Sequence, residues 1–397
     1  MTPFLLAHFT VTTCLGRGLA AHRAALERAA SGLRHCDFET VRLDTWIGEV
    51  DGVDDVRLPL ALARHDCRNN RLALLGLAAD GFEDAVRAAI GKVGKRRFGV
   101  ILGTSTSGIL QTELAYRRRD PATGALPDDF IYPTTHNTYS VAGFVRDYLG
   151  LEGPAVVVST ACSSSAKVFA AAARMIECGI IDAALVGGVD SLCLTTLYGF
   201  SSLELTSTEP CRPYDANRRG ISVGEGAAYA LLEKPSGSLD ADAILLLGAG
   251  ESSDAYHMSS PHPDGLGARL AMARALADAG LPPSDIDYIN LHGTATPSND
   301  AAEGKAVAAL FGDRVPMSST KGATGHTLGA AGAVEAAISA LALRHGFLPG
   351  GANTQTPDPA IAIDYLLATR NGGVRRALSN SFGFGGSNCS LVFGRAR

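Results

Sequence analysis

Segments typical of β-strands alternate with segments typical of α-helices along this chain, and the alternation occurs twice. Apolar and β-branched runs predict strands, and alanine-rich or periodic apolar runs predict helices. The first half has predicted strands at 4–13, 98–102, 156–158, 182–186 and 227–232, and helices at 18–30, 66–79, 82–90 and 167–175. The second half has predicted strands at 243–247, 288–291, 315–319, 375–379 and 389–393, and helices at 265–279, 300–311 and 328–345. Few regular signals occur at 31–60 or between 103 and 150.

This alternation favours a layered α/β fold in which central sheets lie between helices. The repeated order indicates an internal duplication, with an N-terminal half at 1–240 and a C-terminal half at 241–397. The chain has 397 residues, of which 46% are hydrophobic, and this is enough for the large core that such a fold requires.

Charge and cysteine usage exclude several classes of protein. The net charge of −5 gives no indication of binding to nucleic acid or to an anionic membrane surface. No run of about 18 uncharged apolar residues predicts a membrane span, and residues 1–8 lack the basic region of a signal peptide. The eight cysteines form no Cys-x-x-Cys pair, so neither a zinc site nor a disulfide framework is predicted. We expect a reduced, cytoplasmic protein.

The stretch around Cys162 is the first candidate for chemistry. It follows the strand at 156–158 and precedes the helix at 167–175, so the cysteine is predicted to lie at a helix N-terminus. Three serines after it could supply N-cap hydroxyls, and free backbone N–H groups there favour an anion. The helix end contributes about 1 kcal/mol to a thiolate, and imidazoles could lower the thiol pKa further. The alternative is a buried structural cysteine, the usual state of this residue.

Two histidines follow strands within turns rich in glycine and threonine. They are His292 and His326, and strand ends in open α/β sheets are where ligand and catalytic groups collect. The alternative for either one alone is a hydrogen-bonded core residue. His257 and His262 lie near each other but have no further metal-ligand spacing, so no metal is predicted.

Four motifs resemble the signatures of the elongating β-ketoacyl-acyl-carrier-protein synthases of the thiolase superfamily, in the order and spacing of that family. A segment at 252–257 is also similar, and the similarity runs from about residue 95 to the C-terminus. The four motifs are Thr160-Ala161-Cys162-Ser163-Ser164, His292-Gly293-Thr294-Ala295-Thr296-Pro297, Lys321-Gly322-Ala323-Thr324-Gly325-His326 and Asn380-Ser381-Phe382-Gly383-Phe384-Gly385-Gly386-Ser387-Asn388.

The resemblance implies a duplicated, five-layer αβαβα sandwich of the thiolase type, usually dimeric. It implies an acyltransferase that performs a decarboxylating Claisen condensation, in which Cys162 holds an acyl chain and malonyl-carrier protein extends it by two carbons. The phosphopantetheine arm belongs to the acyl carrier protein, so no separate cofactor is expected. The expected partners are this carrier protein and a second subunit, either identical or similar to a chain-length factor.

The resemblance also assigns roles to single residues. His292 and His326 would stabilise the enolate that decarboxylation leaves. Lys321 and Glu303 would form a charged pair that orients the site. The backbone N–H groups of Cys162 and Phe384 would bind the acyl oxyanion, and Phe384 would also act as a mobile gate. The residues expected to contact substrate are Thr294, Thr296, Ile221 and Phe382, and those expected to bind the carrier protein are Arg68 and Arg71, with 117–119 as a second candidate.

One residue departs from the pattern of the fatty-acid members, which usually carry phenylalanine where Ile221 stands. With the segment Cys67-Arg68-Asn69-Asn70-Arg71, this departure looks more like bacterial synthases that make polyunsaturated chains such as aryl polyenes. Fatty-acid, polyene and polyketide extension all stay open.

Three other functions remain as alternatives. A catalytically silent chain-length subunit would lack the active cysteine, whereas Cys162 is present. A thiolase acting on coenzyme A esters would use acetyl-CoA in place of malonyl-carrier protein. A Cys–His hydrolase would leave the motif containing Lys321 unexplained.

Overall fold

The computed structural model describes residues 1–396, in which strands from both halves form one continuous sheet path. The first half contributes the neighbouring strands β6-β5-β7-β9-β1, and the second contributes β12-β11-β15-β16-β10. The first set spans β1 (Phe4–Thr13), β5 (Phe98–Gly103), β6 (Ala155–Val158), β7 (Ala183–Asp190) and β9 (Gly226–Glu233). The second set spans β10 (Ile244–Ser253), β11 (Tyr288–Asn290), β12 (Met317–Ser318), β15 (Arg376–Gly383) and β16 (Ser387–Arg395).

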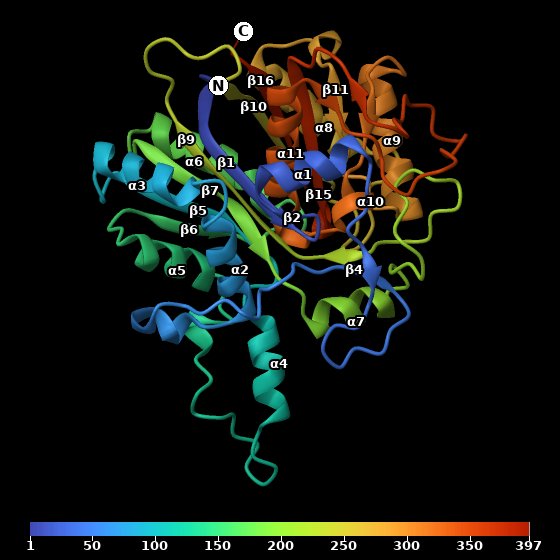
Figure 1. The fold of residues 1–397 in the computed structure, drawn as a ribbon. Helices are drawn as coiled ribbons and strands as arrows, with labels where there is room; N and C mark the ends of the chain where they lie inside the picture. The colour runs from blue at the N-terminus through green and yellow to red at the C-terminus, as the bar shows by residue number, and fades with distance from the viewer. Residues whose placement is uncertain (397) are drawn as a thin grey trace.

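The two sets have the same spatial order when each is numbered along the chain. In both, the third strand lies at one end, followed by the second, fourth, fifth and first. The two first strands, β1 and β10, pair antiparallel over three residues and join the halves. This repeat confirms the predicted duplicated fold, and the loop between β9 and β10 contains position 240. In Figure 1 strands β5, β6 and β7 lie to the left, and the orange and red strands β11 and β15 lie to the right.

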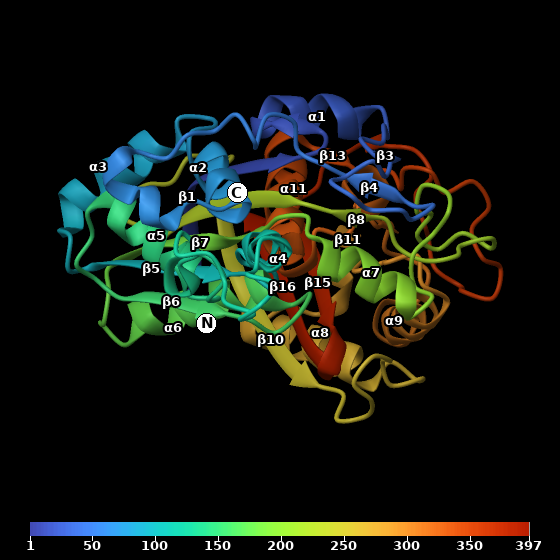
Figure 2. The same cartoon turned by 90° about the horizontal axis from the view of Figure 1, so that it is seen from below.

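Helices form three layers around the two sets of strands. The middle layer is α6 (Ser164–Glu177) and α11 (Ala331–His345), which contact each other and both sets. One outer layer contains α2 (Arg68–Leu77), α3 (Phe82–Val93) and α5 (Ser140–Leu149), and the other contains α8 (Leu266–Ala279) and α9 (Pro297–Phe311). Figure 2 shows this arrangement from below. Three separate apolar clusters fill the spaces between these helical layers and the strands, as a five-layer sandwich requires.

The middle helices pack closely because small residues face each other. A Cβ at Gly332 of α11 would lie 2.5 Å from the backbone nitrogen of Ala166 in α6. In α11, every residue from Ala331 to Leu343 is buried, so this helix is enclosed on all sides.

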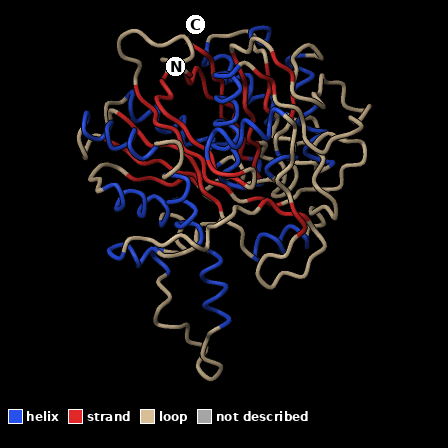
Figure 3. Tube along the Cα trace, in the orientation of Figure 1, coloured by secondary structure: helices blue, strands red, loops and turns tan. Residues whose placement is uncertain are grey.

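Several elements were not predicted. They include α4 (Ile109–Arg117), α7 (Leu194–Ser202) and α5, with short strands such as β3 (Arg34–His35), β4 (Trp46–Gly48) and β8 (Val223–Gly224). In α5 the apolar residues Val141, Phe144, Val145 and Leu149 are buried at helical spacing, so this helix carried a periodic signal that the prediction missed. α4 and the loop after it project from the body (Figure 3), and only two of its residues are buried. Among the described residues no helix has the length and apolar character needed to cross a membrane.

Candidate active site

Cys162 lies in the turn between β6 and α6, two residues before the helix begins. Ala161, directly before it, has φ +51, a left-handed conformation that side chains other than glycine rarely adopt. The predicted position at a helix N-terminus is therefore confirmed. The serines act differently from the prediction, because they do not cap the helix. Ser163 and Ser164 instead donate hydroxyl hydrogen bonds to the carbonyl oxygens of Thr160 and Ala161, at 2.9 and 2.5 Å.

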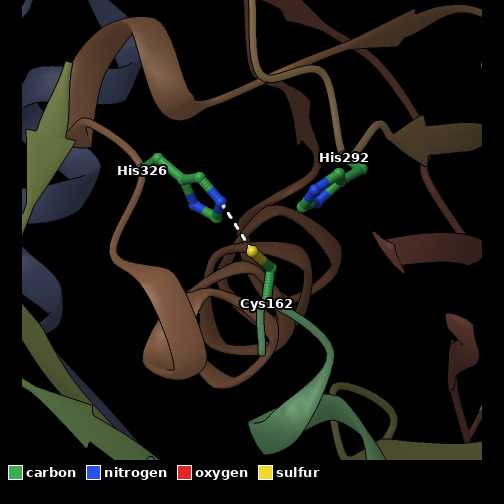
Figure 4. Close-up of side chains that lie close together, drawn as sticks. All are labelled: Cys162, His292 and His326. Atoms are coloured by element: carbon green, nitrogen blue, oxygen red, sulfur yellow. Dashed lines mark hydrogen bonds between the residues drawn. The ribbon is translucent and has the colours of Figure 1, made fainter. Parts of the chain in front are cut away.

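Both histidines lie beside this cysteine, although they come from the other half of the chain (Figure 4). The Sγ of Cys162 is 3.0 Å from Nε2 of His326. One ring nitrogen from each histidine and the sulfur all lie within 4.8 Å of one another. The two imidazole rings are nearly perpendicular, with centroids 5.4 Å apart. All three side chains are buried, so the site can exclude bulk water.

Backbone contacts hold each histidine in place. His292 follows β11, and the Glu303 carboxylate on α9 accepts hydrogen bonds from the N–H groups of His292 and Gly293, both at 2.8 Å. His326 is held by strand β8, since its N–H donates to Ser222 at 2.8 Å and its carbonyl accepts from Gly224 at 2.9 Å. Both rings therefore sit on anchored backbone, which favours fixed geometry.

Lys321 forms an ion pair with Glu335 of α11, so the expected pair with Glu303 is wrong. Its Nζ also donates to the carbonyl oxygen of His292 at 2.5 Å and lies 3.3 Å from Nδ1 of that ring. An ammonium group can only donate. Nδ1 of His292 is thus the acceptor, and the ring proton is placed on Nε2, facing the site. Glu335 had a signal in the sequence, because it is the single charged residue between 328 and 343.

Burial sets the protonation states of the site. It lowers the pKa of both His292 and His326 well below the usual value, and the nearby Lys321 cation acts in the same direction. Both imidazoles are neutral at pH 7. Burial also raises the pKa of Cys162 to about 11, while Lys321 and the Phe384 N–H oppose this shift. The expected lowering of the thiol pKa is wrong for the resting site, because desolvation outweighs the helix end.

We expect alkylation of Cys162 by iodoacetamide to accelerate about tenfold per pH unit between pH 7 and 10, because only the thiolate reacts. The rate would be measured as loss of activity and as added mass on the Cys162 peptide. A Cys178→Ser background removes an exposed thiol that would otherwise consume the reagent. A rate that is already constant below pH 8 would contradict the raised pKa.

A pocket that is partly open to solvent leads to the cysteine and histidines. The expected substrate residues Thr294, Thr296, Ile221 and Phe382 all line it, as does Phe384. The two threonine hydroxyls lie 2.9 Å apart, which leaves further hydrogen-bonding capacity for a polar arm.

Phe384 is 37% exposed at this pocket and packs against Phe200 of α7, with ring centroids 5.9 Å apart. Gly385 follows it at φ +79, with no atom near its missing side chain. Because Phe384 lies between Gly383 and Gly385, the backbone around it can rotate with little steric hindrance. Phe200 was not predicted and has no distinguishing signal in the sequence.

The two arginines expected to bind a carrier protein both form ion pairs within the chain. Arg68 is 5% exposed, and its guanidinium pairs with Glu225 at 2.6 Å and with Glu49 at 3.0 Å. Arg71 forms two hydrogen bonds to Asp66, at 2.6 and 2.7 Å. Burial and internal pairing make Arg68 unavailable, so its assignment to carrier binding is wrong, whereas Arg71, whose side chain is 25% exposed, stays a prediction.

The cysteine and two histidines also form a set of side chains that could ligate a metal. Two features oppose this use. Nε2 of His292 carries the proton that Lys321 places there, so it offers no lone pair to a metal. The ammonium of Lys321 would in addition repel a divalent cation.

Comparisons with known proteins agree with this geometry. Residues 68–237 match the family model described as beta-ketoacyl synthase, N-terminal domain, and residues 244–355 match the corresponding C-terminal domain. A mitochondrial 3-oxoacyl-[acyl-carrier-protein] synthase of Arabidopsis thaliana is 42% identical over 270 residues, which are 64% of this chain and 59% of that protein. 3-oxoacyl-[acyl-carrier-protein] synthase 2 of Vibrio cholerae is 34% identical over 402 residues and 96% of both chains. A ketosynthase in complex with its chain length factor from Xenorhabdus doucetiae has 37% identity and a TM-score of 0.89, covering 100% of this chain and 98% of that one.

Proposed function

The chain belongs to the β-ketoacyl synthase family and is a 3-oxoacyl-[acyl-carrier-protein] synthase, and on this premise we propose that Cys162, His292 and His326 perform its decarboxylating condensation. The observation that carries the proposal is the convergence of one sulfur and two imidazoles, from separate halves of the chain, within 4.8 Å. Each of the three has a defined task in two successive reactions.

In the first reaction Cys162 takes an acyl group from a carrier-protein thioester. Its sulfur attacks the carbonyl carbon, and the bond from that carbon to the pantetheine sulfur breaks. The nearest acceptor for the thiol proton is Nε2 of His326, at 3.0 Å, which passes it to the departing sulfur. Among the described residues Nδ1 of His326 has no hydrogen-bond partner, so no contact fixes its tautomer, and between the two reactions the ring loses the Nδ1 proton to water and takes one from water on Nε2. The N–H groups of Cys162 and Phe384 bind the oxyanion.

In the second reaction malonyl-carrier protein loses carbon dioxide, and the electron pair of the broken bond forms an enolate. Nε2–H of His292, fixed by Lys321, and Nε2–H of His326 donate to the enolate oxygen. The enolate carbon attacks the acyl group on Cys162, the bond to sulfur breaks, and the thiolate takes a proton from solvent. The product carries two more carbons.

We propose that no separate cofactor takes part. The thioester arm of the carrier protein enters the pocket past Thr294 and Thr296, whose hydroxyls can donate to its amide carbonyls. The alternatives explain less of this site. A catalytically silent chain-length subunit would not need a cysteine beside two neutral histidines. A hydrolase would not need the buried Lys321.

We propose a partner subunit of the same fold, bound through the projecting arm formed by α4 and the loop up to residue 139. Four aromatic or aliphatic side chains on this arm are 40–53% exposed, namely Tyr116, Ile131, Tyr132 and Tyr139. Strand β6, which follows this arm in the sequence, is the last strand at one end of the sheet path. Its Val156 is 37% exposed. Exposed apolar side chains and an open strand edge favour association with another subunit. The Xenorhabdus doucetiae relative, a complex with a chain length factor, supports a heterodimer.

We propose extension of a polyene or polyketide chain in preference to primary fatty-acid synthesis. Ile221 lines the pocket beside the cysteine and histidines, where a smaller side chain than phenylalanine leaves more room.

Native mass spectrometry of the purified chain after incubation with acyl- and malonyl-carrier protein tests this function. We expect a dimer that carries an acyl group on Cys162 and releases a 3-oxoacyl product two carbons longer. Acetyl-CoA in place of malonyl-carrier protein is the control, and efficient use of it would favour a thiolase. If no acyl group is bound with or without a chain-length partner, the proposed function is wrong.

A further inference from the structure

Asp190, the last residue of β7, is fully buried (0% exposed) and takes no part in the reactions above. Its carboxylate accepts hydrogen bonds from the hydroxyls of Thr104, Ser105 and Thr106, at 2.6, 2.6 and 2.8 Å. The backbone N–H groups of Ser105 and Thr106 also donate to it, both at 2.8 Å. A sixth donor is the N–H of Gly329, at 2.5 Å. One carboxylate thus collects donors from both halves of the chain.

The bond to Gly329 holds the segment that carries His326. Leu328, between them, has φ +53, a strained conformation for a leucine, so its surroundings must impose it. Ser105 Oγ lies 3.2 Å from the same N–H and reinforces the contact. On its other side His326 is fixed by β8. Asp190 therefore supplies the second of two anchors for this histidine.

The other donors lie in the turn after β5, which abuts the start of the cysteine's helix. A Cβ at Gly103 would lie 2.4 Å from the nitrogen of Ser165 in α6, so the end of β5, where this turn begins, is in backbone contact with the helix. Asp190 consequently ties the turn against which the Cys162 helix rests to the loop that carries His326.

We propose that Asp190 is a positioning residue that fixes His326 relative to the helix of Cys162 across the two halves. The proposal rests on the proposed role of His326 in enolate stabilisation. An asparagine would keep the size of Asp190, but its N–H₂ group would face hydrogen-bond donors and could not accept from them. The turn at Leu328 would then lose the contact that holds it. Misplacement of a catalytic group by about 1 Å can cost a reaction about 100-fold.

The test measures carbon dioxide release from malonyl-carrier protein in a Cys162→Gln background, where no acyl transfer interferes. We expect Asp190→Asn to slow decarboxylation about 10- to 100-fold. If Asp190 acts through His326, the same substitution added to His326→Ala causes no further loss. A merely structural role would instead lower both backgrounds by the same factor, and this result would overturn the proposal.

Asp215→Asn is the matched control. Asp215 is also buried and accepts three backbone N–H bonds, but it contacts none of the site residues. We expect it to leave decarboxylation within about twofold. If Asp190→Asn does not fold, Ser105→Ala replaces it. We expect Ser105→Ala to slow decarboxylation several-fold when His326 is present, and to cause no further loss when it is added to His326→Ala. An unchanged rate for His326→Ala alone would remove the role of His326 and this inference together. If His326→Ala slows decarboxylation but Asp190→Asn slows it further by the same factor as without His326→Ala, only the inference about Asp190 would be wrong.

Discussion

Replacing Cys162 by alanine is expected to lower condensation by at least about 10⁴-fold, because the covalent intermediate can no longer form. The rate would be measured as formation of 3-oxoacyl-carrier protein from acyl- and malonyl-carrier protein. The fold should be unaffected, since alanine is smaller and the turn is held by Ser163 and Ser164. Cys36→Ala is a matched control, because Cys36 is buried to the same degree, 7% exposed, and should retain activity within a few-fold.

Cys162→Gln separates the two reactions that alanine removes together. The glutamine amide resembles an acyl thioester, and its oxygen can accept from the backbone N–H groups that otherwise bind the acyl carbonyl. We expect this variant to release carbon dioxide from malonyl-carrier protein while making no extended product. Condensation by either variant would exclude Cys162 as the nucleophile. A Cys162→Gln protein that neither condenses nor decarboxylates, although folded, would contradict the role of the acyl-enzyme mimic.

The long strands and most helices could be predicted because their periodicity is local. The strand predicted at 4–13 is β1 itself, and the helix predicted at 265–279 differs from α8 by one residue. The projecting arm could not be predicted in this way, because α4 buries only Leu110 and Ala115 and so has almost no apolar face. Its structure depends on contacts such as that of Glu113, which accepts from the N–H groups of Leu194 and Thr195 in α7.

The site divides along the same line. Cys162, His292 and His326 were predicted because each lies in a distinctive turn directly after a strand or beside a helix start. The partner of Lys321 was not, because Glu303 and Glu335 are both helical glutamates and only the packing of α11 decides between them. Arg68 failed for a related reason. Its charge suggested a surface position, whereas its guanidinium is buried and paired with Glu225, which is 157 residues away in the sequence.

The Lys321–Glu335 pair leads to the second large expected effect, which concerns decarboxylation. Lys321→Met removes the donor that fixes the tautomer of His292, and it leaves Glu335 buried without a cation. We expect decarboxylation in a Cys162→Gln background to fall about 10²- to 10³-fold, comparable to the loss of one donor to a developing oxyanion. We also expect the free energy of unfolding to fall by about 3–5 kcal/mol, the usual cost of breaking a buried pair. Lys305→Met removes an exposed lysine and should change neither quantity.

The pH dependence of this loss has a definite sign. Burial raises the pKa of Glu335 to about 7, above its ordinary value of 4.5, although Lys321 opposes the shift. A carboxyl whose pKa is raised by folding contributes most to stability below pH 4.5, where it is protonated, and this contribution is lost as pH rises through 7. Without Lys321 the pKa rises further. The melting temperature of Lys321→Met should therefore fall more steeply than that of the native protein between pH 5 and pH 8.

A compensating substitution separates stability from catalysis. Glu335→Gln added to Lys321→Met removes the unpaired acid while keeping its size, so most of the lost stability should return. Decarboxylation should stay slow, because no donor then reaches Nδ1 of His292 and the Nε2 proton is no longer fixed. Recovery of both quantities would mean that Lys321 serves only to neutralise Glu335. Recovery of the melting temperature alone would place the catalytic effect of Lys321 on the imidazole that it holds.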